Sequence, residues 1–339
     1  TMYPASAHDM EFNHTMTDLS KSIKLSAWPG VKEEIVKQVT DLLGDLPKPP
    51  KDRQFKILEE YESKGKAARR RIGFYAADDE LVTGWLFVPE GSKEEVPGIL
   101  CCHGYTPYGK DEPAGLEGDM HLALAQHYAE RGYATLAVDM PTAGERAGAK
   151  RKPYDGEQFH RDNPKLSLAG KALSDHMQAV AVFGDLKRVD PARIGVIGHG
   201  LGAFNALLLA GLDSRVQACV ASCGFTRFAT DKTPGVWPED EGLVLLPKAV
   251  EIGAAGGDFP VDWEHILSLA APTAVQIITS LSNAIQANPK SCQKAVATAG
   301  KIYKMLGAES ALDHYTNYDG RDLTETTLEV ADEWFERWL

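Results

Sequence analysis

The chain lacks a basic stripe, a long apolar run and a cleavable leader pattern. Its 339 residues carry 36 Lys and Arg against 48 Asp and Glu, for a formal net charge of −12 at pH 7. This acidic balance without a basic face excludes nucleic acid from the expected partners. No apolar stretch approaches the length of a membrane span, and the first twenty residues contain no apolar core of a signal peptide. We therefore expect no membrane partner.

Cysteine motifs and cofactor motifs are missing as well. None of the five cysteines has Cys-x-x-Cys spacing, so the sequence predicts neither a zinc site nor a disulfide framework. Reduced thiols and a cytoplasmic location are the simplest interpretation. There is no phosphate-binding loop, no dinucleotide fingerprint and no cluster of metal-ligand residue types. We expect no metal and no cofactor.

What is present is a regular alternation of apolar strands and helical segments. We expect strands at 71–75, 81–88, 96–102, 134–139, 194–197, 216–223, 274–279 and 312–318. Helices are expected at 31–43, 116–131, 166–186, 201–212, 292–306 and 324–339, the last with Thr324 as its N-cap. This order predicts an α/β fold with a mostly parallel sheet covered by helices on both faces.

Two levels of organisation follow from this pattern. Residues 1–65 are expected to form a helical extension packed on the core, and residues 66–339 the main domain. Two long insertions, at about 140–164 and 224–263, each follow a strand. They would lie over the carboxyl ends of the strands, where open α/β sheets bind ligands, and are predicted to be lid-like.

The most informative motif is a nucleophile elbow without its serine. Gly198-His199-Gly200-Leu201-Gly202 directly follows an apolar run at 193–197. In the Gly-x-Ser-x-Gly elbow, a strand turns sharply into a helix and presents its central residue at the head of the sheet. Glycine suits the strained turn because it tolerates a positive φ, but it has no side chain that could attack a substrate.

Further motifs occur in a consistent order around this elbow. They are Pro97–Gly104, Gly132–Asp139, Val189–Gly195, Ala271-Pro272 and the terminal segment Glu333–Leu339. Together they resemble the α/β-hydrolase superfamily, in particular its dienelactone-hydrolase-like and acetyl-xylan-esterase-like branch, over about residues 70–339. The resemblance implies the α/β-hydrolase fold, an oxyanion hole and a Ser-His-Asp triad.

The residues at the three triad positions depart from that family pattern. Gly200 replaces the serine, Asn283 (or Ser282 beside it) stands at the acid position, and Arg321 stands at the histidine position. If the glycine at position 200 were an engineered replacement of a native serine, it would explain one of the three departures and leave the other two unexplained. These departures predict a degenerate catalytic triad, because nucleophile, base and orienting acid are all needed.

From that loss we expect a non-hydrolytic enzyme of specialised metabolism. It would act on a small molecule bearing a carbonyl or carboxylate, by lyase, cyclase, isomerase or decarboxylase chemistry. One alternative is an inactive protein that only binds a ligand. The other is a residual esterase-like hydrolase in which His199 or Glu145 activates a water molecule. The oligomeric state, including a homodimer, stays open.

The expected site combines main-chain donors with a few side chains. The amides of Leu201 and Tyr105 would stabilise an oxyanion, and Arg321 would either clamp an acidic group or pair with a neighbouring acid. One of Asp139 and Glu145, if buried, would act as a general acid or base; the alternative for each is pairing with Arg146. The remaining candidates either contact a ligand in the pocket or are structural. They are His103, His199, Tyr108, Trp237 and Cys223, the last as an inert buried thiol or a replacement nucleophile.

Overall fold

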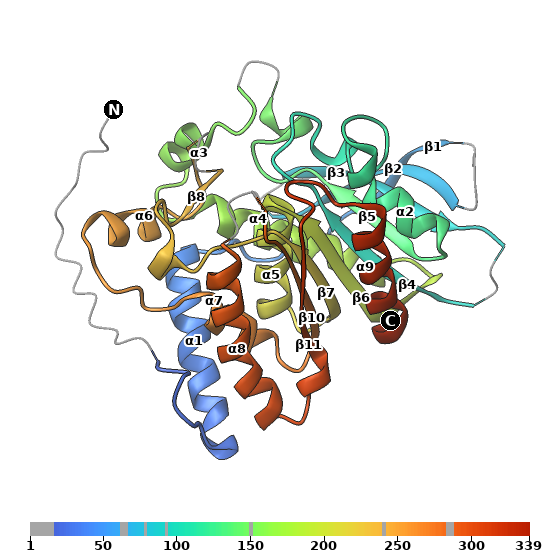
Figure 1. Cartoon of the computed structure of the whole chain (residues 1–339). Helices are drawn as coiled ribbons and strands as arrows, with labels where there is room; N and C mark the ends of the chain where they lie inside the picture. Colours follow the sequence, from blue (N-terminus) through green and yellow to red (C-terminus); the bar gives the residue numbers. More distant parts are fainter. Residues whose placement is uncertain are drawn as a thin grey trace.

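The computed structural model describes residues 17–61, 67–77, 80–91, 94–148, 152–238, 242–282 and 288–339 (Figure 1). Its centre is a nine-stranded sheet in the order β1-β2-β3-β5-β4-β6-β7-β10-β11. The strands are β1 (Lys56–Tyr61), β2 (Ala67–Tyr75), β3 (Leu81–Pro89), β4 (Val96–Cys102), β5 (Ala134–Val138), β6 (Val189–His199), β7 (Val216–Ser222), β10 (Ala274–Ser280) and β11 (Leu312–Asn317). β1, β2, β3 and β5 pair antiparallel in turn, whereas the pairs from β5 through β11 are parallel. The predicted mostly parallel α/β sheet is confirmed.

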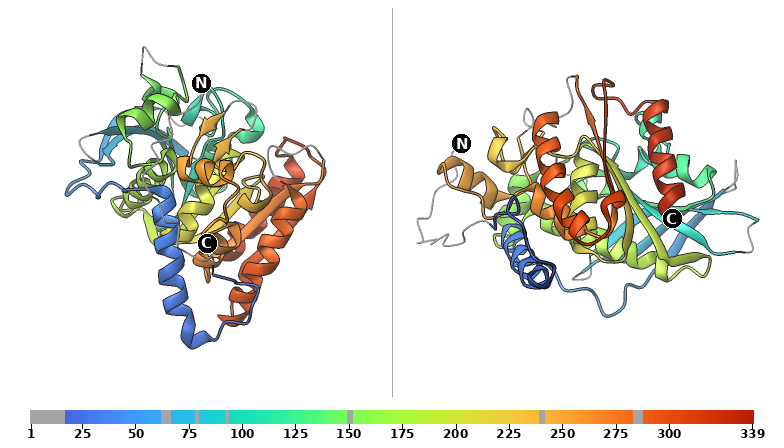
Figure 2. Two further views of the ribbon diagram at one scale, coloured as in Figure 1. Left: turned by 90° about the vertical axis from the view of Figure 1, so that its left-hand side faces the viewer. Right: turned by 60° about the horizontal axis from the view of Figure 1, so that its bottom comes forward.

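Helices cover both faces of this sheet. They are α1 (Trp28–Leu43), α2 (Leu124–Glu130), α3 (Gly156–Asp162), α4 (Leu168–Gly184), α5 (Leu201–Leu212), α6 (Pro247–Ala254), α7 (Trp263–Ala270), α8 (Pro289–Met305) and α9 (Glu325–Trp338). α2 and α9 lie on one face, and a layer built from α1, α4, α5, α7 and α8 covers the other. Figure 2 shows the same arrangement from two further directions, with α1 in blue and α9 in dark red on opposite sides of the sheet.

The burial of the central elements explains why they form. Every residue of β5 and of β10 is buried, as expected for strands covered on both faces. α5 consists almost entirely of Leu, Ala and Gly and is buried on all sides except at Leu212. A helix that is apolar all round belongs in a core, and α5 lies between the sheet and helices α4 and α7. This places the elbow that precedes α5 in a rigid setting.

The N-terminal segment and the two insertions have their own structure. α1 buries Ile35, Val39 and Leu43 and contacts α4 and α7. The same segment, expected to be helical, also supplies β1 at the edge of the sheet. The insertion at 140–164 contains α3, and the insertion at 224–263 contains α6 and a two-stranded ribbon, β8 (Val236–Trp237) with β9 (Leu243–Val244).

Helix boundaries follow the sequence pattern with one exception. Thr324 caps α9, because its side chain accepts a hydrogen bond from the amide of Thr327, as predicted. The helix expected at 116–131 begins only at Leu124. Gly118 has φ 83° and Ala123 has ψ 50°, and neither value is helical. Apolar spacing through 116–122 therefore gave a wrong helix start.

Among the helices of the described residues, none combines the length and the apolar character needed to cross a membrane.

Candidate functional site

The elbow geometry is formed at the junction of β6 and α5. Gly200 adopts φ 55° and ψ −120°, and α5 starts at the next residue, Leu201. The amide of Gly200 donates a hydrogen bond of 2.8 Å to the carbonyl of Ser222 at the end of β7. The first amides of a helix have no partner within the helix and carry its positive end, so the amide of Leu201 is placed to meet developing negative charge.

The two flanking glycines are required by close packing. A Cβ at Gly198 would lie 2.2 Å from the carbonyl carbon of Gly202, and one at Gly202 would lie 2.1 Å from the carbonyl oxygen of Cys102. Both contacts are backbone contacts that cannot move aside. The glycine pattern therefore encodes the approach of α5 to β4 and β6, independently of any catalytic residue.

This packing makes a stability prediction. We expect Gly202→Ala to lower the free energy of unfolding by about 3 kcal/mol, because the new methyl group overpacks against backbone. Gly300→Ala in α8 is the matched control, since its Cβ would meet nothing within 4 Å. That change should leave stability unchanged or raise it by up to about 1 kcal/mol. Urea denaturation measures both variants, and equal stability of Gly202→Ala and the parent protein would contradict the packing.

The loop after β4 faces the elbow and is held by two aromatic hydrogen-bonding groups. His103 accepts a hydrogen bond of 3.0 Å at Nε2 from the amide of Met140 and donates from Nδ1 to the carbonyl of Gly104 at 2.7 Å. Burial lowers the pKa of His103, so the ring is a neutral structural link between the ends of β4 and β5. The hydroxyl of Tyr154 accepts a hydrogen bond from the amide of Thr106 at 3.0 Å and donates one to the carbonyl of Thr106 at 2.8 Å.

Tyr105 and Tyr108, both expected near the pocket, lie in this loop region. The ring of Tyr105 packs against the ring of Tyr154 with centroids 4.2 Å apart. Tyr108 is 43% exposed. The loop that would carry the second oxyanion donor is therefore ordered by Tyr154, which sequence reasoning did not single out.

Asp139 and Glu145 both form ion pairs, but not with the predicted partner, Arg146. Asp139 is fully buried and accepts hydrogen bonds from the amide and the Nζ of Lys110, at 2.8 and 2.7 Å. Glu145 accepts from Arg71 at 2.9 Å and from the hydroxyl of Thr83 at 2.6 Å. Partial burial raises the pKa of Glu145, but the Thr83 hydrogen bond and the Lys110 and Arg71 charges outweigh this effect, and the pKa is lowered. A carboxylate held in this way is a poor base.

The expected pairing of these acids with Arg146 is wrong. The guanidinium of Arg146 pairs with Asp175 at 2.7 Å and with Glu80, and it reaches Asp139 only at the main-chain carbonyl, at 3.1 Å. Lys171 completes this second network by pairing with Asp175 and Glu80. Arg146 was the predicted partner because it is close to both acids in the sequence. In the fold, the partners come from separate elements: Lys110 pairs with Asp139, and Arg71 pairs with Glu145.

His199 is the titratable group placed most directly at the elbow. Its Nε2 donates to the main-chain carbonyl of Arg321 at 3.0 Å, because a carbonyl can only accept. Nδ1 is then unprotonated and accepts from the hydroxyl of Ser222, also at 3.0 Å. Burial holds the pKa of His199 below its ordinary value of 6.5, against the raising effects of the Arg321 carbonyl and of the Asp119 and Asp322 charges. The imidazole is a neutral base near pH 7.

Ser222 is a residue at the elbow that the sequence analysis did not single out. It is 3% exposed and ends β7, where it pairs in parallel register with His199. The strand order alone could have found it, because β6 and β7 are consecutive parallel strands whose carboxyl ends meet at one edge. The sequence analysis named its neighbour, Cys223, as a candidate instead.

The other predicted side chains are placed as follows. Cys223 is buried with φ 55°, and burial raises the pKa of its thiol, which opposes nucleophilic use. The side chain of Arg321 is exposed, and its carbonyl is the atom that contacts the elbow histidine. Trp237 is buried in β8. Asn283 lies outside the described residues, while Ser282 donates to the carbonyl of Tyr318 at 2.6 Å.

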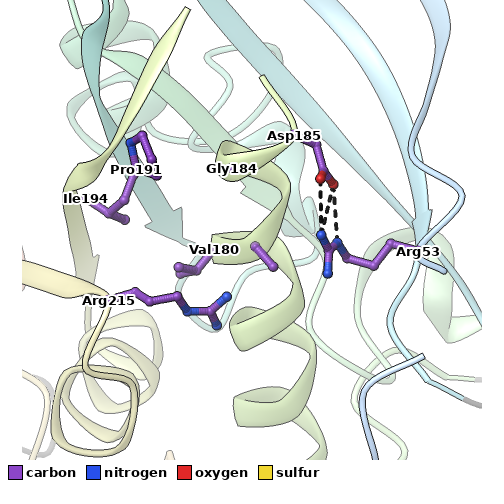
Figure 3. Close-up of a pocket in the computed structure, with 8 residues that line it drawn as sticks. Arg53, Val180, Gly184, Asp185, Pro191, Ile194 and Arg215 are labelled. Atoms are coloured by element: carbon purple, nitrogen blue, oxygen red, sulfur yellow. Dashed lines mark hydrogen bonds and ion pairs between the residues drawn. The ribbon is translucent and has the colours of Figure 1, made fainter. Parts of the chain in front are cut away.

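A pocket of about 270 Å³ lies at the other end of β6 and is not part of this site. Figure 3 shows Pro191 and Ile194 on one side of it and Arg53 on the other, with Arg53 paired to Asp185 at 3.1 Å. Pro191 and Ile194 belong to the part of β6 that precedes its carboxyl end. Ligands of open α/β sheets bind outside the carboxyl ends of the strands, so we place the candidate site at the elbow.

Residues 50–229 match the model of a family described as acetyl xylan esterase (AXE1). The chain belongs to the acetyl xylan esterase family. Among its sequence relatives, esterase FrsA of Photorhabdus laumondii is 27% identical over 155 residues, which cover 46% of this chain and 31% of that protein. The quorum-quenching protein AidA of Acinetobacter baumannii is 27% identical over 251 residues, 73% of this chain and 71% of that protein. The chain thus spans less than a third of the FrsA length.

The fold of this family member is also that of a solved esterase. A glucuronoyl esterase from Solibacter usitatus superposes with a TM-score of 0.75 at 13% identity, covering 95% of this chain and 97% of that one. This likeness shows the α/β-hydrolase fold, as the motifs predicted.

The expectation of a non-hydrolytic enzyme with lyase-type chemistry and a degenerate triad is wrong. The chain belongs to the acetyl xylan esterase family, which favours the hydrolytic alternative. That expectation rested on the residue types at the three triad positions alone, 200, 283 and 321. The elbow turn, the start of helix α5 and a buried histidine that is hydrogen-bonded to Ser222 are all present around Gly200.

Proposed function

We propose that the protein is an esterase-like hydrolase that cleaves a carboxylic ester of a small molecule. The observation that carries the proposal is the elbow at Gly200, with φ 55° and ψ −120°, which places the amide of Leu201 at the start of α5. This is the position from which hydrolases of this fold stabilise the oxyanion of a tetrahedral intermediate. Membership of the acetyl xylan esterase family supports the same reaction class.

The surroundings of the elbow support the proposal further. The loop from His103 to Thr106 is held by Tyr154, so the opposite wall of the oxyanion site is ordered. His199 offers an unprotonated Nδ1 and is oriented by the carbonyl of Arg321. A general base oriented by a third group is the arrangement that acyl-transfer enzymes share. The proposed reaction therefore needs no acid or base beyond His199.

A panel of chromogenic esters tests this proposal. The purified protein is incubated with p-nitrophenyl acetate, butyrate and benzoate and with acetylated xylan, and product release is followed against buffer. We expect release that is proportional to protein concentration and is lost after heat denaturation. A folded protein that hydrolyses none of these esters faster than buffer would contradict the proposal.

The pH dependence of that activity follows from the state of His199. A base acts while unprotonated, so kcat/KM should be constant at high pH and fall as pH drops through the pKa of the free enzyme. Because burial lowers the pKa of His199 below 6.5, the acidic limb should lie below pH 6.5. The charges of Asp119 and Asp322, together with the hydrogen bond to the Arg321 carbonyl, oppose this shift without reversing it. A kcat/KM profile from pH 4.5 to 8.5 measures the limb, and a midpoint above 6.5 would contradict the assignment.

A further inference from the structure

A serine and a histidine meet at the elbow although the elbow residue is glycine. Ser222 donates to Nδ1 of His199 at 3.0 Å, and Nε2 of His199 donates to the Arg321 carbonyl at 3.0 Å. A nucleophile within hydrogen-bond reach of a base, with the base oriented by a third group, is the diagnostic arrangement for covalent catalysis. Here a main-chain carbonyl takes the part that a carboxylate takes in most triads.

We propose that Ser222 is the catalytic nucleophile of this protein and that His199 is its base. The inference rests on the proposed ester hydrolysis and adds to it the residue that carries the acyl group. The nucleophile would thus have moved from the elbow at the end of β6 to the end of the adjacent strand β7.

The position of Ser222 beside the oxyanion donor supports this assignment. The Ser222 carbonyl accepts the amide of Gly200, which is the residue before Leu201, so strand end and helix start are joined directly. Gly200 itself has no side chain that could attack a substrate, so an attacking group at the elbow has to come from a neighbouring element. The residue after Ser222, Cys223, has φ 55°, a strained conformation for a residue that is not glycine. Strained residues of this kind are held by the surrounding structure, and they cluster at active sites.

The steps of the reaction can be written with these groups alone. The Oγ of Ser222 bonds to the ester carbonyl carbon while its proton passes to Nδ1 of His199, and the oxyanion lies at the Leu201 amide. Collapse of the tetrahedral intermediate breaks the bond between the carbonyl carbon and the leaving oxygen. The leaving alkoxide accepts the proton from His199 and departs as an alcohol. Water then attacks the acyl-enzyme and gives a proton to His199. The acid leaves and Ser222 recovers its proton.

The chain contains a second hydroxyl–imidazole pair that serves as a control. Thr279 in β10 lies 3.0 Å from Nε2 of His314 in β11. Thr279 is buried like Ser222, but it is on a strand that is not joined to the elbow residue. Thr279→Val removes a hydroxyl of similar burial without touching the proposed machinery.

Active-site labelling tests the inference without requiring that the ester substrate be known. The protein is treated with an alkyl fluorophosphonate, which bonds to an activated serine oxygen as fluoride leaves, and the labelled residue is mapped by peptide mass spectrometry. We expect one label on Ser222, no label in Ser222→Ala, and full labelling in Thr279→Val. His199→Gln should slow labelling at least tenfold. A label on Cys223 or on any other residue would overturn the inference.

Ester turnover separates this inference from the proposed function. Ser222→Ala should lower kcat/KM by about 10³-fold or more, while Thr279→Val stays within about twofold. Each variant removes a buried hydroxyl that is hydrogen-bonded to a histidine, so the two melting temperatures should fall by similar small amounts. If Ser222→Ala hydrolyses esters as fast as the parent protein, ester hydrolysis stands and the nucleophile assignment fails. If the parent protein labels at Ser222 but turns over no ester, the nucleophile stands and the proposed function fails.

Discussion

Lys110→Met is expected to lower the free energy of unfolding by about 3 to 5 kcal/mol, the cost of leaving a buried charge without its partner. The ammonium of Lys110 and the carboxylate of Asp139 are almost fully buried and lie 2.7 Å apart. Among the residues that the structure describes, removing the ammonium leaves the carboxylate with two donors, the main-chain amides of residues 110 and 145. Because Lys110 follows the loop at 103–106, we also expect a lower kcat/KM. Urea denaturation and ester turnover measure the two effects.

A double variant separates charge from packing in this prediction. Lys110→Met with Asp139→Asn removes both charges, so it should recover part of the stability lost in Lys110→Met. Arg53→Met is a matched control, since the Arg53–Asp185 pair is partly exposed, with side chains 28% and 37% accessible. Exposed pairs contribute only about 0 to 1 kcal/mol. A Lys110→Met protein as stable as Arg53→Met would show that the buried pair does not hold the loop.

His199→Gln is expected to reduce kcat/KM for ester hydrolysis by about 10²- to 10⁴-fold, the usual contribution of a positioned general base. Glutamine can still donate to the carbonyl of Arg321, but its amide cannot accept a proton from Ser222 near pH 7. Thermal unfolding should therefore change less than activity. Initial rates with p-nitrophenyl acetate at pH 7.5 measure the loss.

The matched control for this variant is His314→Gln. His314 is a half-buried histidine that is also hydrogen-bonded to a hydroxyl, that of Thr279, but in the β10–β11 pair. We expect its kcat/KM to stay within about threefold of the parent value, an effect well below that of a general base. Equal losses in the two histidine variants would show that His199 acts only through the stability of the sheet.

Local rules were enough to predict the fold and the elbow from the sequence. Apolar strands and amphipathic helices alternate along the chain. The glycines at 198 and 202 stand where an added Cβ would lie 2.2 and 2.1 Å, respectively, from a backbone atom of a neighbouring segment. Such constraints leave a readable pattern because they restrict residue type at fixed spacing. The turn at 116–123 left no such trace, since its apolar residues mimic helical spacing.

The site could be predicted only in part, because its contacts join distant segments. The position of Arg321 near the elbow was expected, yet the atom in contact is its carbonyl and not its guanidinium. The preceding residue, Gly320, donates its amide to the hydroxyl of Ser280 at 2.8 Å, which joins this loop to the end of β10. The pairing of Ser222 with His199 likewise arises from the β6–β7 register. Residue types at three triad positions could not show either contact.

A crystal structure of the protein with an alkyl trifluoromethyl ketone would test most directly whether an ester carbonyl is held at the elbow. Such ketones add an active-site hydroxyl to form a tetrahedral adduct that resembles the reaction intermediate. We predict that the adduct oxygen lies within hydrogen-bond distance of the Leu201 amide, with the former carbonyl carbon bonded to the Oγ of Ser222 beside His199. An adduct formed elsewhere, or one whose oxygen points away from the Leu201 amide, would contradict ester cleavage at this site.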